Sequence, residues 1–167
     1  MDALAEKLDT KLRTWQPETA AQVRQRVAEV IDLADEDVLD VLDDLMRSHG
    51  FDYIPTAVGV GSGGSFATGE FRRGSRTIEL HYRDSLGLVT YRVGDLLLSH
   101  EDYMWSILGE RWRSQYPGFS KEPLDGFRRL RADWENHCFE FFGGSDADFA
   151  SRAQQAEYLK KAASRLP

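Results

Sequence analysis

The chain has 167 residues, of which 41% are hydrophobic and 29% are charged, and its formal net charge is −7. This composition is typical of one soluble folded domain and argues against disorder. The longest apolar runs are far shorter than the ~20 residues that a membrane-spanning helix needs, and the acidic charge opposes nucleic-acid binding. We therefore expect a cytoplasmic protein, folded as a single domain over residues 1–167, whose partner is neither a membrane nor a nucleic acid.

Residues 1–50 are predicted to be helical. Four apolar residues recur at helical spacing before Pro17, which ends that helix because proline lacks the amide hydrogen that the next turn needs. The four are Leu4, Leu8, Leu12 and Trp15. A second apolar stripe predicts a longer helix over about 20–49, and Gly50 is placed to stop that helix as a left-handed cap.

The second predicted helix is strongly acidic and carries the whole net charge. Eight acidic residues between Glu29 and Asp44 are accompanied by Arg47 alone, which leaves 20 basic and 20 acidic residues elsewhere. Like charges four residues apart cost a helix about 0.2 to 0.5 kcal/mol per pair, so a helix that tolerates this repulsion indicates a basic partner. The predicted partner-binding residues are Asp32, Asp35, Glu36, Asp37, Asp40, Asp43 and Asp44.

The acidic helix is also compatible with two roles that need no partner protein. Its charged face can simply be solvated, since amphipathic helices place charge outward. Its carboxylates can also pair with arginines of the same chain, which lie in the predicted strands and in the predicted C-terminal helix. These arginines are Arg72, Arg73, Arg76, Arg83, Arg92, Arg128, Arg129 and Arg131.

Residues 51–98 are predicted to form antiparallel strands. Apolar and polar residues alternate over 76–83 and again over 88–93, so each segment has one core face. Asp84-Ser85-Leu86-Gly87 suits a tight turn between them, and Gly94-Asp95 suits the next turn.

Residues 99–167 are predicted to be helical again. Ser99 with Asp102 reads as a capping box that opens a helix through Leu108. Pro123 suits the first turn of another helix, which runs to Gly143-Gly144 with a buried stripe. The stripe contains Phe127, Leu130, Trp134, either His137 or Cys138, and Phe141. Ser145 with Asp148 caps the last helix, which ends near Pro167.

This order of elements predicts the fold class α+β. Contiguous strands flanked by helices indicate an antiparallel sheet of about four to five strands in the middle of the chain, packed by N-terminal and C-terminal helices. Alternating strand–helix units are not indicated.

Catalytic and cofactor motifs fail on their context. Gly59 to Gly64 satisfies G-x-G-x-x-G, but a strand follows it, whereas a dinucleotide site needs a helix N-terminus there. The four histidines share no metal-ligand spacing, and the single cysteine, Cys138, is expected to be a buried thiol. We therefore expect no catalytic, cofactor-binding or metal-binding residues, and no enzyme.

A small enzyme and a regulatory subunit remain as alternatives to a binding protein. The enzyme, of unknown reaction, would have its site at the glycine-rich loop, near His81, Asp84 and His100. The regulatory subunit would belong to a larger assembly.

The central part of the chain resembles bacterial immunity proteins of polymorphic toxin systems. The resemblance covers about residues 76–134 and is carried by the runs LHYRDSLGLVTY (80–91), LSHEDYM (98–104), YPGF (116–119) and PLDGFRRLR (123–131). It implies an α+β protein without catalysis that binds a cognate toxin and blocks it. Combined with the acidic helix, which lies outside the matched runs, it predicts a basic toxin whose nucleic-acid-binding surface the helix occupies.

Overall fold

The computed structural model describes residues 25, 39–61, 64–83, 85–109 and 124–164. The predicted helix before Pro17, most of the predicted acidic helix, and the loop at 116–119 lie outside these residues. The described elements begin with a π-helical turn, η1 (Leu39–Asp43), and α3 (Asp44–Ser48). Five strands follow: β1 (Asp52–Gly61), β2 (Gly64–Arg73), β3 (Arg76–Arg83), β4 (Ser85–Val93) and β5 (Leu96–Ser99). The remaining helices are α4 (His100–Leu108), α5 (Asp125–His137), α6 (Phe139–Gly143) and α7 (Asp146–Ala163).

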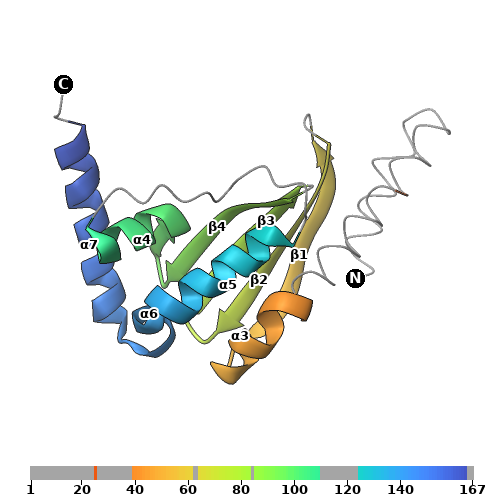
Figure 1. The fold of residues 1–167 in the computed structure, drawn as a ribbon, viewed down its shortest axis with the longest axis horizontal. Coiled ribbons are helices and arrows are strands. Elements are labelled where there is room, and N and C mark those ends of the chain that lie inside the picture. Colours follow the sequence, from red (N-terminus) through yellow and green to blue (C-terminus); the bar gives the residue numbers. More distant parts are fainter. Residues whose placement is uncertain (1–24, 26–38, 62–63, 84, 110–123, 165–167) are drawn as a thin grey trace.

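The five strands form one antiparallel sheet in the order β1-β2-β3-β4-β5, so each strand pairs with its neighbours in the chain (Figure 1). Sequential hairpins of this kind need only short connections. Gly74 (φ 58°) and Gly94 (φ 57°) take the left-handed conformation at two of the turns, as expected where a side chain would be strained. The predicted fold class, α+β with a central antiparallel sheet, is confirmed.

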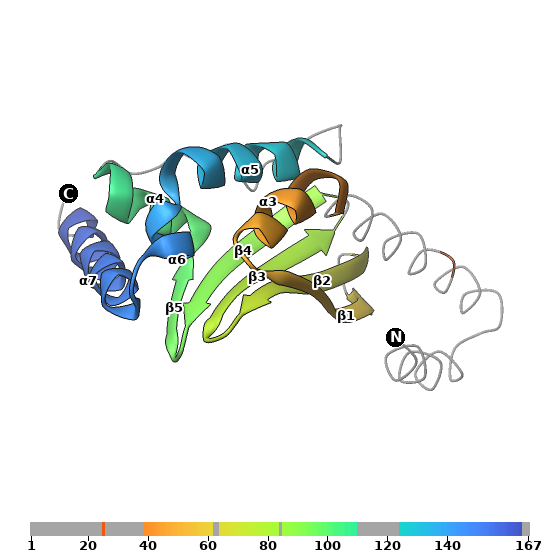
Figure 2. The same cartoon turned by 90° about the horizontal axis from the view of Figure 1, so that it is seen from below.

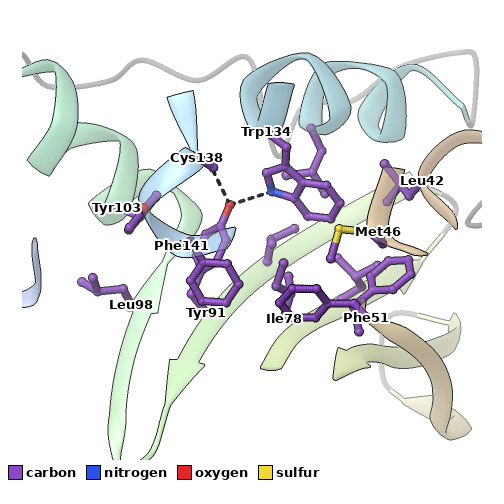
Figure 3. Close-up of a cluster of buried hydrophobic side chains, with 14 of the residues drawn as sticks. Leu42, Met46, Phe51, Ile78, Tyr91, Leu98, Tyr103, Trp134, Cys138 and Phe141 are labelled. Atoms are coloured by element: carbon purple, nitrogen blue, oxygen red, sulfur yellow. Dashed lines mark hydrogen bonds between the residues drawn. The ribbon is translucent and has the colours of Figure 1, made fainter. Parts of the chain in front are cut away.

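One face of the sheet carries the hydrophobic core. A row of apolar side chains crosses all five strands in register, and α3, α5 and α6 lie over this face (Figure 2). The row consists of Tyr53, Phe71, Ile78, Tyr91 and Leu98. Trp134 and Phe141 from the covering helices contact it, and Leu42 and Met46 bring the end of the acidic segment into the same core (Figure 3). We call this the inner face.

The opposite, outer face is covered by no described helix (Figure 2). Glu70 of β2 and Glu79 of β3 lie directly opposite each other there, a like-charge pair that destabilises a sheet. Arg72 pairs with Glu70, and Arg92 of β4 donates two hydrogen bonds to Glu79, at 2.6 and 3.1 Å. These ion pairs offset the repulsion and make the outer face polar.

The predicted turn at Asp84 to Gly87 is wrong. Arg83 pairs with Ser85, so β4 begins at Ser85 and takes in Leu86 and Gly87 as well. A register shift lies between the Leu80–Val89 pair and the Tyr82–Leu86 pair. This bulge lets Leu86 join Tyr82 in the core, a burial that the local turn signal did not contain.

The predicted continuous helix over 123–143 is also interrupted. Cys138 leaves helical geometry (φ −96°, ψ 23°) and separates α5 from α6. Phe141 and Phe142 of α6 are both buried in the core. The predicted buried stripe is otherwise confirmed, with Cys138 and not His137 as its fourth member.

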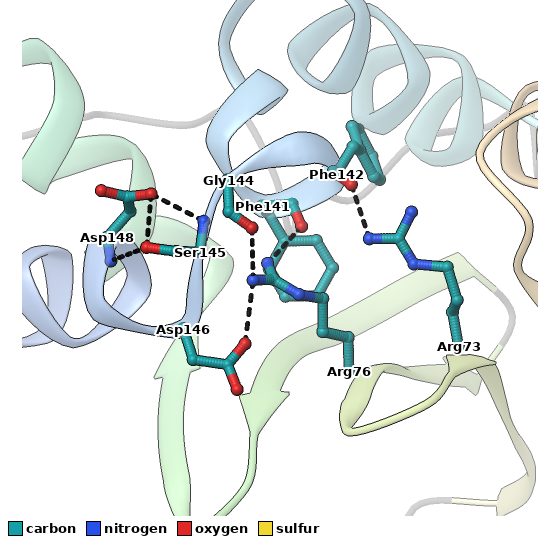
Figure 4. A network of polar contacts seen from close by, with 8 residues as sticks. All are labelled: Arg73, Arg76, Phe141, Phe142, Gly144, Ser145, Asp146 and Asp148. Carbon is teal, nitrogen blue, oxygen red and sulfur yellow. Dashed lines mark hydrogen bonds and ion pairs between the residues drawn. The ribbon is translucent and has the colours of Figure 1, made fainter.

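Two arginines, the buried Arg76 and the partly buried Arg73, hold α6 in this position (Figure 4). Arg76 donates to the carbonyl oxygens of Phe141 (2.5 Å) and Gly144 (2.7 Å) and to the carboxylate of Asp146 (3.0 Å). Arg73 donates to the carbonyl of Phe142 at 2.5 Å and to that of His49 at 2.7 Å. Both arginines therefore satisfy carbonyl groups that helix ends leave without partners.

The predicted caps are present, with one difference. The Ser145 hydroxyl accepts from the Asp148 amide while the Asp148 carboxylate accepts from the Ser145 amide, which is the full capping box. The Ser99 hydroxyl accepts from the Asp102 amide at 3.1 Å. The Asp102 carboxylate, however, pairs with Lys160 of α7 at 2.6 Å, so it fastens α4 to α7 and does not complete a box.

Candidate functional site

The acidic segment is the site that the sequence predicts, and the structure describes its C-terminal end. Asp43 and Asp44 lie at the junction of η1 and α3, and Asp40 lies within η1. The other predicted contacts, Asp32, Asp35, Glu36 and Asp37, lie outside the described residues.

The segment is anchored to the body through its apolar side. Leu42 and Met46 are fully buried in the core, whereas 70% of the Asp44 side chain is exposed. Gly50 has a φ of 76°, which confirms the predicted left-handed cap at the end of this helix. The end of the acidic segment is thus held with one side in the core and Asp44 toward solvent.

Asp44 is paired within the chain. Arg131 of α5 donates two hydrogen bonds to its carboxylate, from Nη1 at 2.6 Å and from Nη2 at 3.1 Å. Arg131 also donates to the Val41 carbonyl (2.6 Å) and to Glu135 (2.8 Å). The bond from Arg131 lowers the pKa of Asp44 below its usual value, and the same bond raises the pKa of Arg131. Asp44 therefore stays ionised at neutral pH with part of its charge already balanced.

Asp43 also has a partner within the segment. Its Oδ2 lies 2.5 Å from Nε of Arg47, one turn further along. Its Oδ1 is buried and has no hydrogen-bond partner among the residues that the structure describes. Pairing with arginines of the same chain thus applies to the two acids of the segment whose side chains are described.

Five of the other candidate arginines contact different parts of the fold. Arg72 and Arg92 pair with glutamates on the outer face, and Arg73 and Arg76 donate to backbone carbonyls near α6. Arg128 lies 3.7 Å from Asp125, three residues earlier on α5. Among the described residues, Arg131 contacts the acidic segment through Asp44.

The glycine-rich segment lies in the sheet. Gly59 and Gly61 end β1 and Gly64 begins β2, so a strand follows the motif, as predicted. A phosphate group would find no helix N-terminus at this point. A Cβ at Gly59 would come within 2.8 Å of the Phe66 ring, so close packing against this ring explains a glycine at this position.

The two histidines of the alternative enzyme site lie on different sides of the sheet. His81 is exposed on the outer face of β3, whereas His100 is buried beside Tyr91 on the inner side. Asp84 lies outside the described residues. Within the described ranges, no group of three His, Cys, Asp or Glu side chains is arranged to hold a metal ion.

A buried polar network is present that sequence reasoning missed. The Tyr91 hydroxyl accepts from the Trp134 indole at 2.8 Å (Figure 3). It also lies 2.6 Å from Nδ1 of His100. Nε2 of His100 lies 2.9 Å from the Asp133 carboxylate. The two ring nitrogens of His100 thus bridge the Tyr91 hydroxyl and the Asp133 carboxylate. The network joins α4, α5 and β4.

Burial determines the chemistry of this network. Burial raises the pKa of Tyr91 well above the usual value and raises the pKa of Cys138 to about 12. The Cys138 thiol lies 3.8 Å from the Tyr91 hydroxyl. Tyr91 and Cys138 are fully buried, so the thiol is protonated and shielded, as predicted for Cys138. This arrangement supports the core and offers no nucleophile to a solvent-borne substrate.

Comparison with protein-family models, with curated proteins and with solved structures gives no match for this chain. None of the described helices is long and apolar enough to cross a bilayer.

Proposed function

We propose that the protein is a cytoplasmic binding protein of the immunity type, which neutralises a cognate bacterial toxin by direct contact. The contact surface is the acidic segment, and the toxin surface that it covers is basic. The protein contributes charge and shape, and no bond is made or broken.

The concentration of charge carries this proposal. The segment from Glu29 to Arg47 holds the whole net charge of −7, while the rest of the chain is balanced. A local field of this kind accelerates association with a basic surface and discourages nucleic acid and anionic membranes. The resemblance of residues 76–134 to immunity proteins agrees with this role.

The anchoring of the segment adds a physical reason. Leu42 and Met46 hold its C-terminal end in the core, so this end needs little further ordering when a partner binds. The bond between Asp44 and Arg131 reduces the share of Asp44 in any contact, because a toxin cation must compete with Arg131. Residues earlier in the segment are therefore expected to contribute more than Asp44.

The test is a pull-down of the tagged chain from its native cytoplasm at low and high salt, with identification of what co-elutes. A stoichiometric basic partner is expected, released by salt and lethal when expressed without this chain. Absence of such a partner at both salt concentrations contradicts the proposed function.

Charge-neutralising variants then locate the surface. The quadruple variant Glu36→Gln, Asp40→Asn, Asp43→Asn, Asp44→Asn is expected to weaken binding about tenfold or more and to flatten its salt dependence. The matched control Asp52→Asn, Asp95→Asn, Glu101→Gln, Glu157→Gln removes the same charge from exposed residues elsewhere and is expected to bind normally. Equal binding by the two variants would show that the acidic segment is not the contact surface.

A further inference from the structure

Strand β1 is a long edge strand. It has ten residues and pairs with β2, and no other strand of the described residues pairs with its second side. Edge strands expose backbone donors and acceptors that can pair with another chain, so proteins shorten, charge or cover them. The opposite edge is treated in this way: β5 has four residues and α7 packs against it (Figure 2).

The second half of β1 has none of these protections among the described residues. No charged residue occurs from Tyr53 to Gly61. Pro55 and the bulge between Pro55 and Ala57 disturb the first half, because proline donates no hydrogen bond and a bulge twists the edge away. From Ala57 to Gly61 the pairing with β2 is regular and the edge is undisturbed.

We propose that residues 57–61 pair antiparallel with the same residues of a second copy, with the twofold axis at Gly59. This register places Gly59 opposite itself and Val58 opposite Val60 of the second copy. Val58 and Val60 share the inner side of the sheet, where Val58 packs against the core and 39% of Val60 is exposed. Two β-branched pairs would then extend the inner row across the axis and cover Val60.

A second copy fits this edge because the strand complements itself. The twofold pairing places residues 57–61 against the same five residues of the second copy, and because these residues are uncharged, no like charges meet there. On the outer side, a Cβ at Gly59 would come within 2.8 Å of the Phe66 ring, so glycine there leaves room for that ring near the axis.

The salt dependence of this dimer is opposite to that of toxin binding. Each copy carries a net charge of −7, so added salt screens the repulsion between two copies and strengthens their association. Salt weakens the contact between the acidic segment and a basic toxin. The two proposals are therefore independent and can fail separately.

The test is sedimentation velocity on the full chain from about 5 to about 500 µM, at low and high salt. A dimer that tightens with salt is expected. Val60→Lys places two ammonium groups beside the axis and is expected to raise the dimer dissociation constant at least about tenfold. Leu97→Lys, on the opposite edge strand at an exposed position, is the matched control and is expected to dimerise normally.

Hydrogen exchange on the unmodified chain keeps the test sound if Val60→Lys does not fold. The amides of 57–61 are expected to exchange more slowly at high protein concentration, while those of β5 do not change. The proposal is overturned if the chain is monomeric at every protein and salt concentration tested, which is also the result expected if other residues of the same chain cover β1. A dimer that Val60→Lys leaves intact also overturns it.

Discussion

Tyr91 and Tyr103 provide a matched test of the buried network. Both rings are fully buried in the same core, with centroids 4.9 Å apart. The Tyr91 hydroxyl is bonded to both Trp134 and His100, whereas the Tyr103 hydroxyl is buried without a hydrogen-bond partner among the described residues. Replacing each tyrosine with phenylalanine removes one oxygen atom and keeps the ring.

The expected effects differ in size and in sign. Tyr91→Phe removes two buried hydrogen bonds, the one that the Trp134 indole N–H donates and the one to Nδ1 of His100. The loss of a buried hydrogen bond from one partner costs about 1 to 3 kcal/mol, so the loss of both is expected to lower the free energy of unfolding by about 3 kcal/mol. Tyr103→Phe breaks no hydrogen bond and removes a buried polar atom, so its stability is expected to be unchanged or slightly higher.

Urea denaturation followed by circular dichroism measures this difference. The urea midpoint of Tyr91→Phe is expected to fall while its m-value stays unchanged. Its Tm is expected to fall by about 6 to 12 °C. Equal stability of the two variants would refute the reasoning, because it would mean that the network contributes nothing. A Tyr91→Phe chain that does not fold at all, beside a folded Tyr103→Phe chain, supports it.

Three further predictions concern the core. Burial raises the pKa of Cys138 to about 12, so a thiol reagent at pH 8 is expected to modify Cys138 only at the rate of unfolding, and fast labelling of the native protein would contradict this. Because the folded state keeps the proton, the contribution of Cys138 to stability is fully present below the unfolded pKa of about 9 and is lost as the pH rises to 12. Arg76→Gln is expected to lower the free energy of unfolding by about 2 to 4 kcal/mol, because only 7% of that side chain is exposed and it donates hydrogen bonds to two carbonyl oxygens. Arg92→Gln, on the outer face, is expected to lower it by under about 1 kcal/mol in the same urea assay. Gly69→Ala is expected to lower the free energy of unfolding by about 1 to 3 kcal/mol, because its Cβ would lie 2.6 Å from ring carbons of Tyr53. Gly74→Ala is the control for backbone strain alone, because Gly74 has a positive φ but open space around it.

Features that depend on neighbouring residues could be predicted from the sequence alone. Alternation over 76–83 predicted the strand and its buried face, because successive side chains of a strand point to opposite sides. The caps at Ser99 and Ser145 and the stop at Gly50 were predictable for the same reason, since each cap forms within a few residues. The fold class followed from the order of these elements.

Contacts between residues far apart in the sequence depend on how the helices and strands pack together. The bulge that admits Leu86 to the core and the break at Cys138 both sacrifice regular local geometry for burial against other elements. The pairing of Asp44 with Arg131 spans 87 positions, and the acidic pattern, which favoured a basic partner, was also compatible with solvent or with an arginine of the same chain. The network around Tyr91 draws on β4, α4 and α5, and only their packing brings a tyrosine, a histidine and an aspartate within hydrogen-bonding distance. Hydrophobic periodicity specifies which side of an element is buried, but not which polar groups meet there, because those depend on the relative position of whole elements.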